Sequence, residues 1–147
     1  MKDKRSLPIG VFDSGMGGLT VLSALKAALP NESYVYLGDT ARLPYGTKSR
    51  NTVVQYAIQM AKCLSEQGIK LLVVACNTAS TAALPTLQSM LPDIPVVGVI
   101  EPGAKAALKA TQNKNILVLA TETTVRSEIY KNTILSMDSQ ANVNSQA

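Results

Sequence analysis

Leu71-Leu-Val-Val-Ala-Cys-Asn-Thr78 is the stretch of this 147-residue chain that decides its fold. Its first five residues are apolar without a break, which is typical of a strand buried on both faces of a sheet. Polar residues follow directly at Cys76, and a helical pattern comes after them. Apolar strands that alternate with helices indicate a parallel sheet covered by helices on both faces.

The same alternation extends in both directions from this strand. Further strands are expected at 8–12, 34–37, 96–100 and 116–120. Helices are expected at 17–29, 51–67, 79–90, 103–111 and 121–135, with Ser49 as the N-cap before the second and Pro85 as a kink in the third. Residues 38–48 have the composition of a loop, and residues 137–147 hold few apolar side chains and no stop signal. We therefore predict a three-layer α/β/α fold around a parallel sheet.

Composition excludes several classes of protein. The chain is 46% apolar and 16% charged, so disordered, collagen-like and coiled-coil chains are excluded. The net charge is only +4, and with one Phe and no Trp there is no stacking platform for nucleic acid, so no nucleic-acid partner is expected. The longest uncharged stretch, 71–92, is too polar to span a bilayer, so we expect no membrane partner and a cytoplasmic location with reduced thiols.

The chain has two cysteines, Cys63 and Cys76, and no histidine. Without an imidazole, the Ser-His-Asp and Cys-His arrangements of hydrolases cannot form. A zinc site built on His and Cys is also excluded, and we expect no bound metal and no cofactor.

Polar and small residues follow each predicted strand. Because ligands of parallel α/β sheets bind beyond the carboxyl ends of the strands, these residues are the candidate site. They are expected to line one edge of the fold, and they comprise Asp13-Ser14-Gly-Met-Gly-Gly18, Gly38-Asp39-Thr40 with Pro44-Tyr45-Gly46, Cys76-Asn77-Thr78, Glu101-Pro102-Gly103 and Thr121-Glu-Thr-Thr124.

The glycine-rich loop after the first strand has two interpretations. A strand, Gly15-x-Gly17 and a helix can place a phosphate at the helix N-terminus, and Asp39 stands where a ribose-binding acid would. However, Thr20 replaces the third glycine of the dinucleotide fingerprint, and Asp13 would lie beside the phosphate. Alternatively, the glycines only permit a tight turn and close helix packing.

The two cysteines lie in different settings. Cys76 stands at the end of the most hydrophobic strand, where the N–H groups of the next helix would face it and stabilise a thiolate. Local sequence leaves open whether it is catalytic or a small core residue. Cys63 falls off the apolar stripe of the 51–67 helix and is expected on its flank or at an interface.

Four motifs occur in order along the chain: Asp13-Ser14-Gly-x-Gly-Gly, Asp39-x-x-x-x-Pro44-Tyr45-Gly46, Ala75-Cys76-Asn77-Thr78-Ala79-Ser80 and Ala120-Thr121-x-x-Thr124-Val125. Together they resemble the N-terminal half of bacterial glutamate racemases, from about residue 8 to residue 130. The resemblance implies an isomerase that interconverts L- and D-glutamate without cofactor or metal, and so supplies D-glutamate for peptidoglycan synthesis.

Racemisation without a cofactor needs two acid/base groups, one on each face of the α-carbon, in opposite protonation states. The family uses two cysteines for this, and the resemblance makes Cys76 one of them, with Asp13 assisting proton transfer and contacting the substrate. It implies further substrate contacts from Ser14, Pro44, Tyr45, Gly46, Asn77, Thr78, Thr121 and Thr124. The family's intact members are expected to be homodimers.

The chain departs from the family pattern in one respect. The second catalytic cysteine belongs to a Gly-Cys-Thr-His motif that does not occur here. We expect residues 1–98 to form the first α/β domain and residues 99–147 to begin a second, similar one. We therefore expect this chain alone not to racemise, and to expose apolar surface around its first four strands and to dissolve poorly.

Three other functions remain open from the sequence. One is a racemase of the same family acting on aspartate or a hydantoin. Another is a nucleotide-binding α/β module. The third is a binding protein without catalysis.

Overall fold

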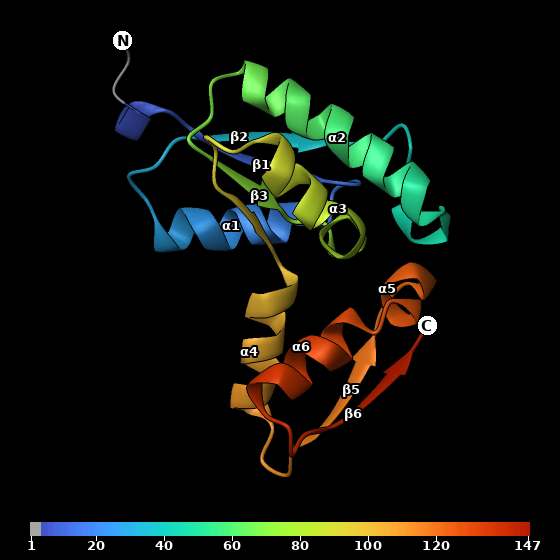
Figure 1. Ribbon diagram of the computed structural model, residues 1–147. Helices are drawn as coiled ribbons and strands as arrows, with labels where there is room; N and C mark the ends of the chain where they lie inside the picture. The colour runs from blue at the N-terminus through green and yellow to red at the C-terminus, as the bar shows by residue number, and fades with distance from the viewer. Residues whose placement is uncertain (1–3) are drawn as a thin grey trace.

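The computed structural model describes residues 4–147 and arranges them in two parallel sheets with helices against them (Figure 1). The first part of the chain contains β1 (Ile9–Asp13), α1 (Gly18–Ala28), β2 (Tyr34–Gly38), α2 (Arg50–Glu66), β3 (Leu71–Val74), α3 (Asn77–Met90) and β4 (Val96–Gly98). The second contains α4 (Ile100–Ala110), β5 (Asn115–Leu119), α5 (Glu122–Arg126), α6 (Ile129–Met137) and β6 (Asn142–Gln146). Short 3-10 helices occupy Lys4–Ser6 and Tyr45–Thr47.

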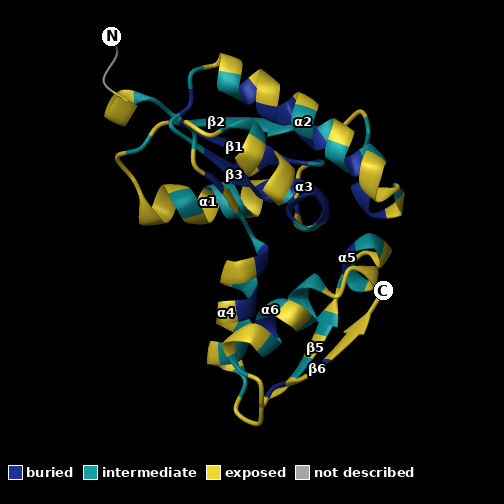
Figure 2. Ribbon diagram, in the orientation of Figure 1, coloured by how far each residue is buried: buried dark blue, intermediate teal, exposed yellow. Residues whose placement is uncertain are grey.

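The first sheet has the strand order β2-β1-β3-β4, and all its neighbouring strands are parallel. Alternate side chains of β1 and β3 face opposite sides, as a strand requires. Phe12, Leu72 and Val74 lie in the core with α2 and α3, whereas Val11 and Val73 pack with α1 on the other face. Figure 2 shows both strands buried between these helices. The prediction of an α/β fold with a parallel sheet covered on both faces is confirmed.

The second sheet pairs only β5 and β6, again in parallel. Its core is formed by Ala104 of α4, Ile134 of α6, and Ala141 and Val143 at the start of β6. On its other face Leu117 is 63% exposed and Leu119 is 72% exposed. The expectation of exposed apolar surface around the first four strands is wrong for β1 and β3, whose side chains are mostly buried, and holds at Val97 of β4, which is 45% exposed. The exposed face of β5 lies outside that prediction.

Several predicted boundaries differ from the structure. Strand β4 ends at Gly98, and α4 begins at Ile100, earlier than the expected residue 103. Pro102 fits in the first turn of α4 because the N–H that it lacks would have no partner inside the helix there. Helix α3 begins at Asn77 rather than at residue 79 and continues through Pro85 without a break. The predicted N-cap is confirmed, since Ser49 Oγ accepts a hydrogen bond from Thr52 N at 3.2 Å.

The expected single helix at 121–135 is wrong, because two helices, α5 and α6, occupy this range. Ser127 Oγ donates to the Thr124 carbonyl at 2.6 Å and accepts from Ile129 N at 3.2 Å, so its hydroxyl replaces helical hydrogen bonds. Glu128 then adopts a left-handed conformation with φ of 52°. Strand β6 is a second difference, since the pattern of 137–147 predicts no strand there.

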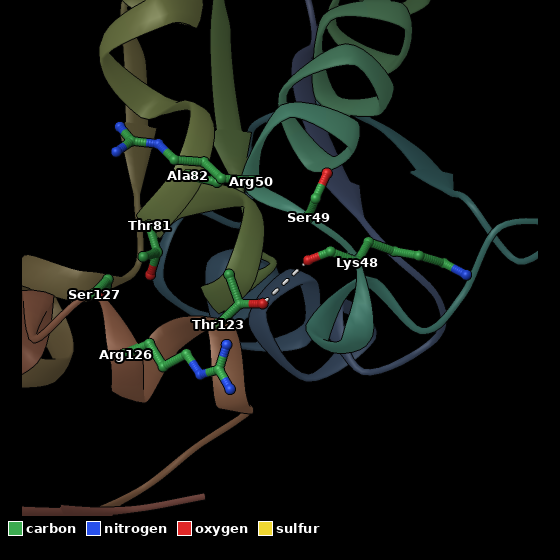
Figure 3. A pocket seen from close by; sticks show the side chains of 8 residues that line it. All are labelled: Lys48, Ser49, Arg50, Thr81, Ala82, Thr123, Arg126 and Ser127. Atoms are coloured by element: carbon green, nitrogen blue, oxygen red, sulfur yellow. Dashed lines mark hydrogen bonds between the residues drawn. The ribbon is translucent and has the colours of Figure 1, made fainter.

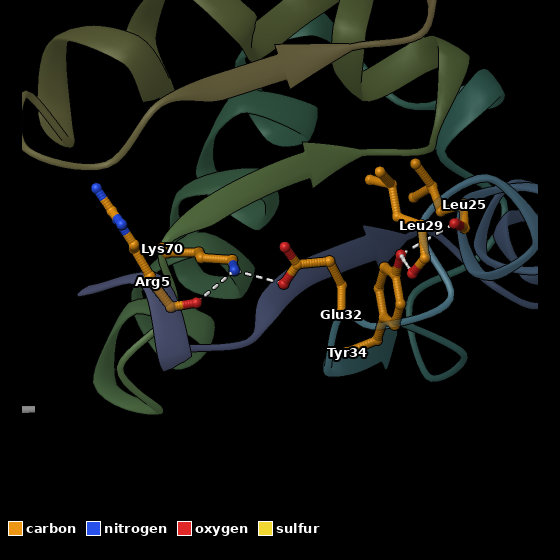
Figure 4. A network of polar contacts seen from close by, with 6 residues as sticks. All are labelled: Arg5, Leu25, Leu29, Glu32, Tyr34 and Lys70. Carbon is orange, nitrogen blue, oxygen red and sulfur yellow. Dashed lines mark hydrogen bonds and ion pairs between the residues drawn. The ribbon is translucent and has the colours of Figure 1, made fainter. Parts of the chain in front are cut away.

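A polar network ties together the amino ends of the first three strands (Figure 4). Lys70, which precedes β3, donates to the Arg5 carbonyl at 2.7 Å and pairs with Glu32, which precedes β2. Tyr34 Oη donates to the carbonyls of Leu25 and Leu29 at 3.0 and 3.1 Å. These contacts lie at the opposite edge from the candidate site residues.

Within the described part of the chain, no helix has both the length and the apolar character needed to cross a bilayer.

Gly18 and Gly17 offer a matched test of packing at the β1–α1 turn. A Cβ on Gly18 would lie 2.5 Å from Asp13 Cβ and 3.1 Å from Ala75 Cβ, whereas a Cβ on Gly17 would meet only Asp13 Oδ2 at 3.8 Å. We expect Gly18→Ala to lower the free energy of unfolding by about 1–3 kcal/mol through overpacking. Gly17→Ala should change it by less than about 0.5 kcal/mol. Urea unfolding measures both, and equal effects would contradict the packing argument.

Candidate active site

Asp13 ends β1 and organises the glycine-rich turn that follows it. Its Oδ2 accepts hydrogen bonds from Gly15 N at 3.0 Å and Gly18 N at 3.1 Å, and the residue is only 7% exposed. Tyr36 of β2 holds the turn from the other side, since its hydroxyl donates to the Gly15 carbonyl at 2.9 Å. The N–H groups that a phosphate would need therefore already bind a carboxylate, which disfavours the nucleotide-binding interpretation.

Cys76 lies where β3 gives way to α3 and serves as the N-cap of that helix. Its sulfur accepts a hydrogen bond from Ala79 N and lies 3.4 Å from Ser14 Oγ, to which the thiol donates. The residue is 5% exposed. The carboxyl edge of the sheet thus brings Ser14 and Cys76 together although they are 62 residues apart, as the sequence predicts. Cys63, in contrast, is exposed on α2.

The electrostatic surroundings connect Asp13, Cys76 and Tyr36. Burial raises the pKa of Tyr36 above its usual value of 10.0, and electrostatic interactions with Asp13 and Cys76 raise it further. At neutral pH the Tyr36 hydroxyl is therefore protonated and remains a donor to Gly15. Both acid/base candidates therefore lie near this tyrosine.

Tyr45 is a loop anchor rather than an exposed side chain. It is 1% exposed, and its hydroxyl donates to Asp39 Oδ2 at 2.5 Å. Arg42 Nε pairs with the same Asp39 oxygen at 2.7 Å, and the Arg42 guanidinium lies 4.4 Å from the ring centre of Tyr56. The phenol therefore holds the loop in place. Pro44 is exposed beside it.

A chain of hydroxyl groups joins the first sheet to the second. Thr78 Oγ1 lies 3.0 Å from Thr121 Oγ1, which lies 3.1 Å from Thr124 Oγ1. Gly46 packs directly on Thr121, since a Cβ on this glycine would lie 2.5 Å from Thr121 Cβ. Thr123 completes the contact by donating to the carbonyls of Gly46 at 3.0 Å and Lys48 at 3.3 Å. The threonines predicted from the sequence therefore meet at the junction of the two sheets.

Tyr130 of α6 is a neighbour of the site that the sequence does not single out. Its hydroxyl donates to Asn77 Oδ1 at 2.6 Å, and burial raises its pKa above 10.0. A cavity of about 430 Å³ opens between these two residues, Thr121, α4 and β5. No local pattern marks Tyr130 as a partner of Asn77, because the two are 53 residues apart.

A second cavity, of about 320 Å³, lies between the start of α2, α3 and α5 (Figure 3). The figure shows the Thr123–Lys48 hydrogen bond on its wall, while the Lys48 ammonium points away from it. The buried Thr81 hydroxyl beside it has no hydrogen-bond partner among residues 4–147. None of the predicted site residues lines this cavity. In the part of the chain that the structure describes, no cluster of three Cys, Asp or Glu residues could hold a metal ion.

The Tyr45–Asp39 pair predicts a specific alkaline instability. Burial and the hydrogen bond to Asp39 raise the pKa of Tyr45 far above 10.0. The unfolded chain releases this proton near pH 10 while the folded chain retains it, so the contribution of this pair to the free energy of unfolding is constant below about pH 10 and falls above it. Urea unfolding at about pH 8 and about pH 11 measures the loss.

Tyr45→Phe is the control for this prediction. It should lower stability at about pH 8 by about 1–3 kcal/mol, because Asp39 loses a buried donor. It should also reduce the further loss above pH 10. A variant with the same alkaline loss as the parent chain would refute the assignment to Tyr45.

Comparison with known proteins places this geometry in a family. The family model described as Asp/Glu/Hydantoin racemase matches residues 9–146. The glutamate racemase of Staphylococcus epidermidis is 51% identical over 140 residues, which cover 95% of this chain and 52% of that protein. The structure of a glutamate racemase isoform from Bacillus anthracis superposes with a TM-score of 0.92 at 46% identity, over 99% of this chain and 54% of the other.

The glutamate racemase of Francisella tularensis, whose structure contains D-glutamate, superposes with a TM-score of 0.87 at 42% identity, over 95% of this chain and 52% of that one. The chain thus spans about half the length of the relatives that it matches. With the family model matching nearly the whole sequence, the chain belongs to the Asp/Glu/Hydantoin racemase family.

Proposed function

We propose that this chain carries one half of the active site of a glutamate racemase, an isomerase that interconverts L- and D-glutamate without a cofactor. In this proposal Cys76 is one of two cysteines that act on opposite faces of the α-carbon. The product, D-glutamate, would supply peptidoglycan synthesis in the cytoplasm. A relative named glutamate racemase, 51% identical over 95% of this chain, supports glutamate as the substrate.

The position of Cys76 is the observation that carries the proposal. Its sulfur lies at the N-terminus of a 14-residue helix, in contact with Ser14 and with the Ala79 N–H, at the carboxyl edge of a parallel sheet. A thiolate there takes the α-proton, forming an S–H bond while the electron pair of the C–H bond remains on the α-carbon. In the reverse direction the thiol returns the proton to the same face.

The negative charge that develops on the substrate needs hydrogen-bond donors around the α-carboxylate. We assign this role to the backbone N–H groups at the start of α3 and to the hydroxyls of Ser14, Thr78 and Thr121. Gly46 packs its backbone against Thr121. Asn77 directly follows Cys76 in the sequence and is assigned a substrate contact as well. Pro44, the Tyr45 backbone and Thr124 would complete the substrate contacts.

Asp13 has a double role in this proposal. Its carboxylate assists proton transfer at Cys76 and also contacts the substrate. The hydrogen bonds from Gly15 and Gly18 occupy Oδ2, so the same group fixes the turn that places Ser14 beside the sulfur. Loss of Asp13 should therefore disturb both the chemistry and the geometry of the turn.

The division of the chain follows from the same proposal. Residues 1–98 form the first racemase domain, and residues 99–147 form the beginning of the second, with the site at their junction. The contacts of Thr78 with Thr121 and of Thr123 with Gly46 join the two parts at this point. The partners of the whole protein are glutamate and a second copy of itself in a homodimer.

Exchange of the α-proton of glutamate in D₂O, followed by NMR, tests the role of Cys76. Because the other cysteine is exposed on α2, we expect exchange on one face of L- or D-glutamate without inversion. Cys76→Ser should slow this exchange by about 10²–10⁴-fold, because the general acid/base is lost. Aspartate run in parallel tests the substrate class.

Cys63→Ser is the matched control, since it removes a thiol that lies outside the site. It should exchange glutamate at the rate of the parent chain. Exchange that survives Cys76→Ser, or that Cys63→Ser abolishes, would refute the assignment. Full racemisation by the chain alone would show that its own residues supply a second acid/base group.

A further inference from the structure

We propose that Tyr130 is a positioning residue that fixes the side-chain amide of Asn77, so that the NH₂ group rather than the oxygen faces the substrate and selects a carboxylate there. This inference rests on the proposed function, because it assigns the specificity of the same site. It adds a residue from α6 to a site otherwise built from the ends of strands and the start of α3.

The contact itself is short and joins distant parts of the chain. Tyr130 Oη donates to Asn77 Oδ1 at 2.6 Å, from α6 to the first residue of α3. Tyr130 is partly buried, and burial keeps its hydroxyl protonated well above neutral pH. The phenol is therefore a donor under all physiological conditions.

The chemistry of the amide turns this contact into a choice of orientation. An asparagine side chain has an acceptor oxygen on one side and an NH₂ donor on the other. With the oxygen bound to Tyr130, the NH₂ group is free to meet a ligand. The flipped amide would present its oxygen to the ligand and leave the phenol proton without an acceptor, which is unfavourable for a partly buried group.

The surroundings of Asn77 reinforce this choice. Asn77 follows Cys76 directly and lies in the first turn of α3, where backbone N–H groups have no partner inside the helix. Asn77, Tyr130 and Thr121 line the same cavity of about 430 Å³. An NH₂ group that joins these N–H donors suits a carboxylate, whereas an amide oxygen would repel it.

Gly103 of α4 makes room for the tyrosine. A Cβ at this position would lie 3.0 Å from Tyr130 Oη and 3.1 Å from Tyr130 Cε1. The missing side chain therefore allows the hydroxyl to reach Asn77 past α4. Residues of three helices, α3, α4 and α6, therefore meet at this hydrogen bond. Tyr130 and Gly103 can both be substituted without changing Asn77.

Tyr130→Phe removes the hydroxyl and keeps the ring. In the ¹⁵N-labelled chain, we expect the side-chain amide signals of Asn77 to shift. We also expect glutamate to bind about 10-fold more weakly, as for the loss of a hydrogen bond that orients a ligand group. Discrimination between glutamate and its two monoamides, glutamine and isoglutamine, should decrease as well, because the amide of Asn77 can then offer either atom.

Tyr34→Phe is the matched control. It removes another tyrosine hydroxyl that binds protein oxygens, at the opposite edge of the first sheet (Figure 4). It should leave the Asn77 signals and the discrimination unchanged, even where it lowers thermal stability as much as Tyr130→Phe does. A structural role for Tyr130 would change stability alone.

Gly103→Ala perturbs the same hydrogen bond by pushing the hydroxyl rather than removing it. It should shift the Asn77 amide signals in the parent chain and cause no further shift in the Tyr130→Phe background, because the two changes act through one contact. Additive shifts would overturn the proposal.

These measurements distinguish failure of the positioning role of Tyr130 from failure of the proposed function. Unchanged Asn77 signals in Tyr130→Phe overturn the positioning role whether or not glutamate binds. Shifted signals with unchanged discrimination overturn the specificity role. If the parent chain shows neither glutamate binding nor exchange dependent on Cys76, the proposed function fails and the specificity role fails with it, while the Asn77 signals still decide whether Tyr130 orients the amide.

Discussion

The first turn of α3 is the constraint on which the site depends. Three consecutive residues there reach three different parts of the molecule: Cys76 contacts Ser14 after β1, Asn77 contacts Tyr130 of α6, and Thr78 contacts Thr121 after β5. Because successive side chains leave a helix about 100° apart, one turn can face both sheets at once. The strand before this turn fixes where it begins, since β3 is buried in the centre of the first sheet.

Much of this arrangement is predictable from the sequence, because it depends on strand ends. Uninterrupted apolar runs give the five strands, and parallel pairing brings their carboxyl ends to one side, so Ser14, Cys76, Thr78 and Thr121 are expected near one another before any coordinates are known. Asp13 also falls in this set. Its partners, Gly15 and Gly18, follow from the need for a tight turn into α1.

The remaining features depend on contacts that local sequence does not record. The break between α5 and α6 comes from a serine hydroxyl that competes for backbone hydrogen bonds, in a stretch whose apolar spacing continues on both sides. Strand β6 buries only Val143, so its sequence carries no alternating signal. Tyr45 is in a loop of small and polar residues, yet its phenol is held in the core by Asp39. Tyr130 reaches Asn77 through the space left at Gly103.

The two sheets bury their strands very differently, and this difference has a consequence for cooperativity. The first sheet is covered on both faces, whereas the second has two strands, one packed face and Leu117 and Leu119 exposed on the other. Two strands covered on one face open at a lower free energy than four strands covered on two. We therefore expect the second sheet to open at a lower free energy than the first. In that order of opening, the threonine contacts at the junction would be lost while Cys76 still caps α3.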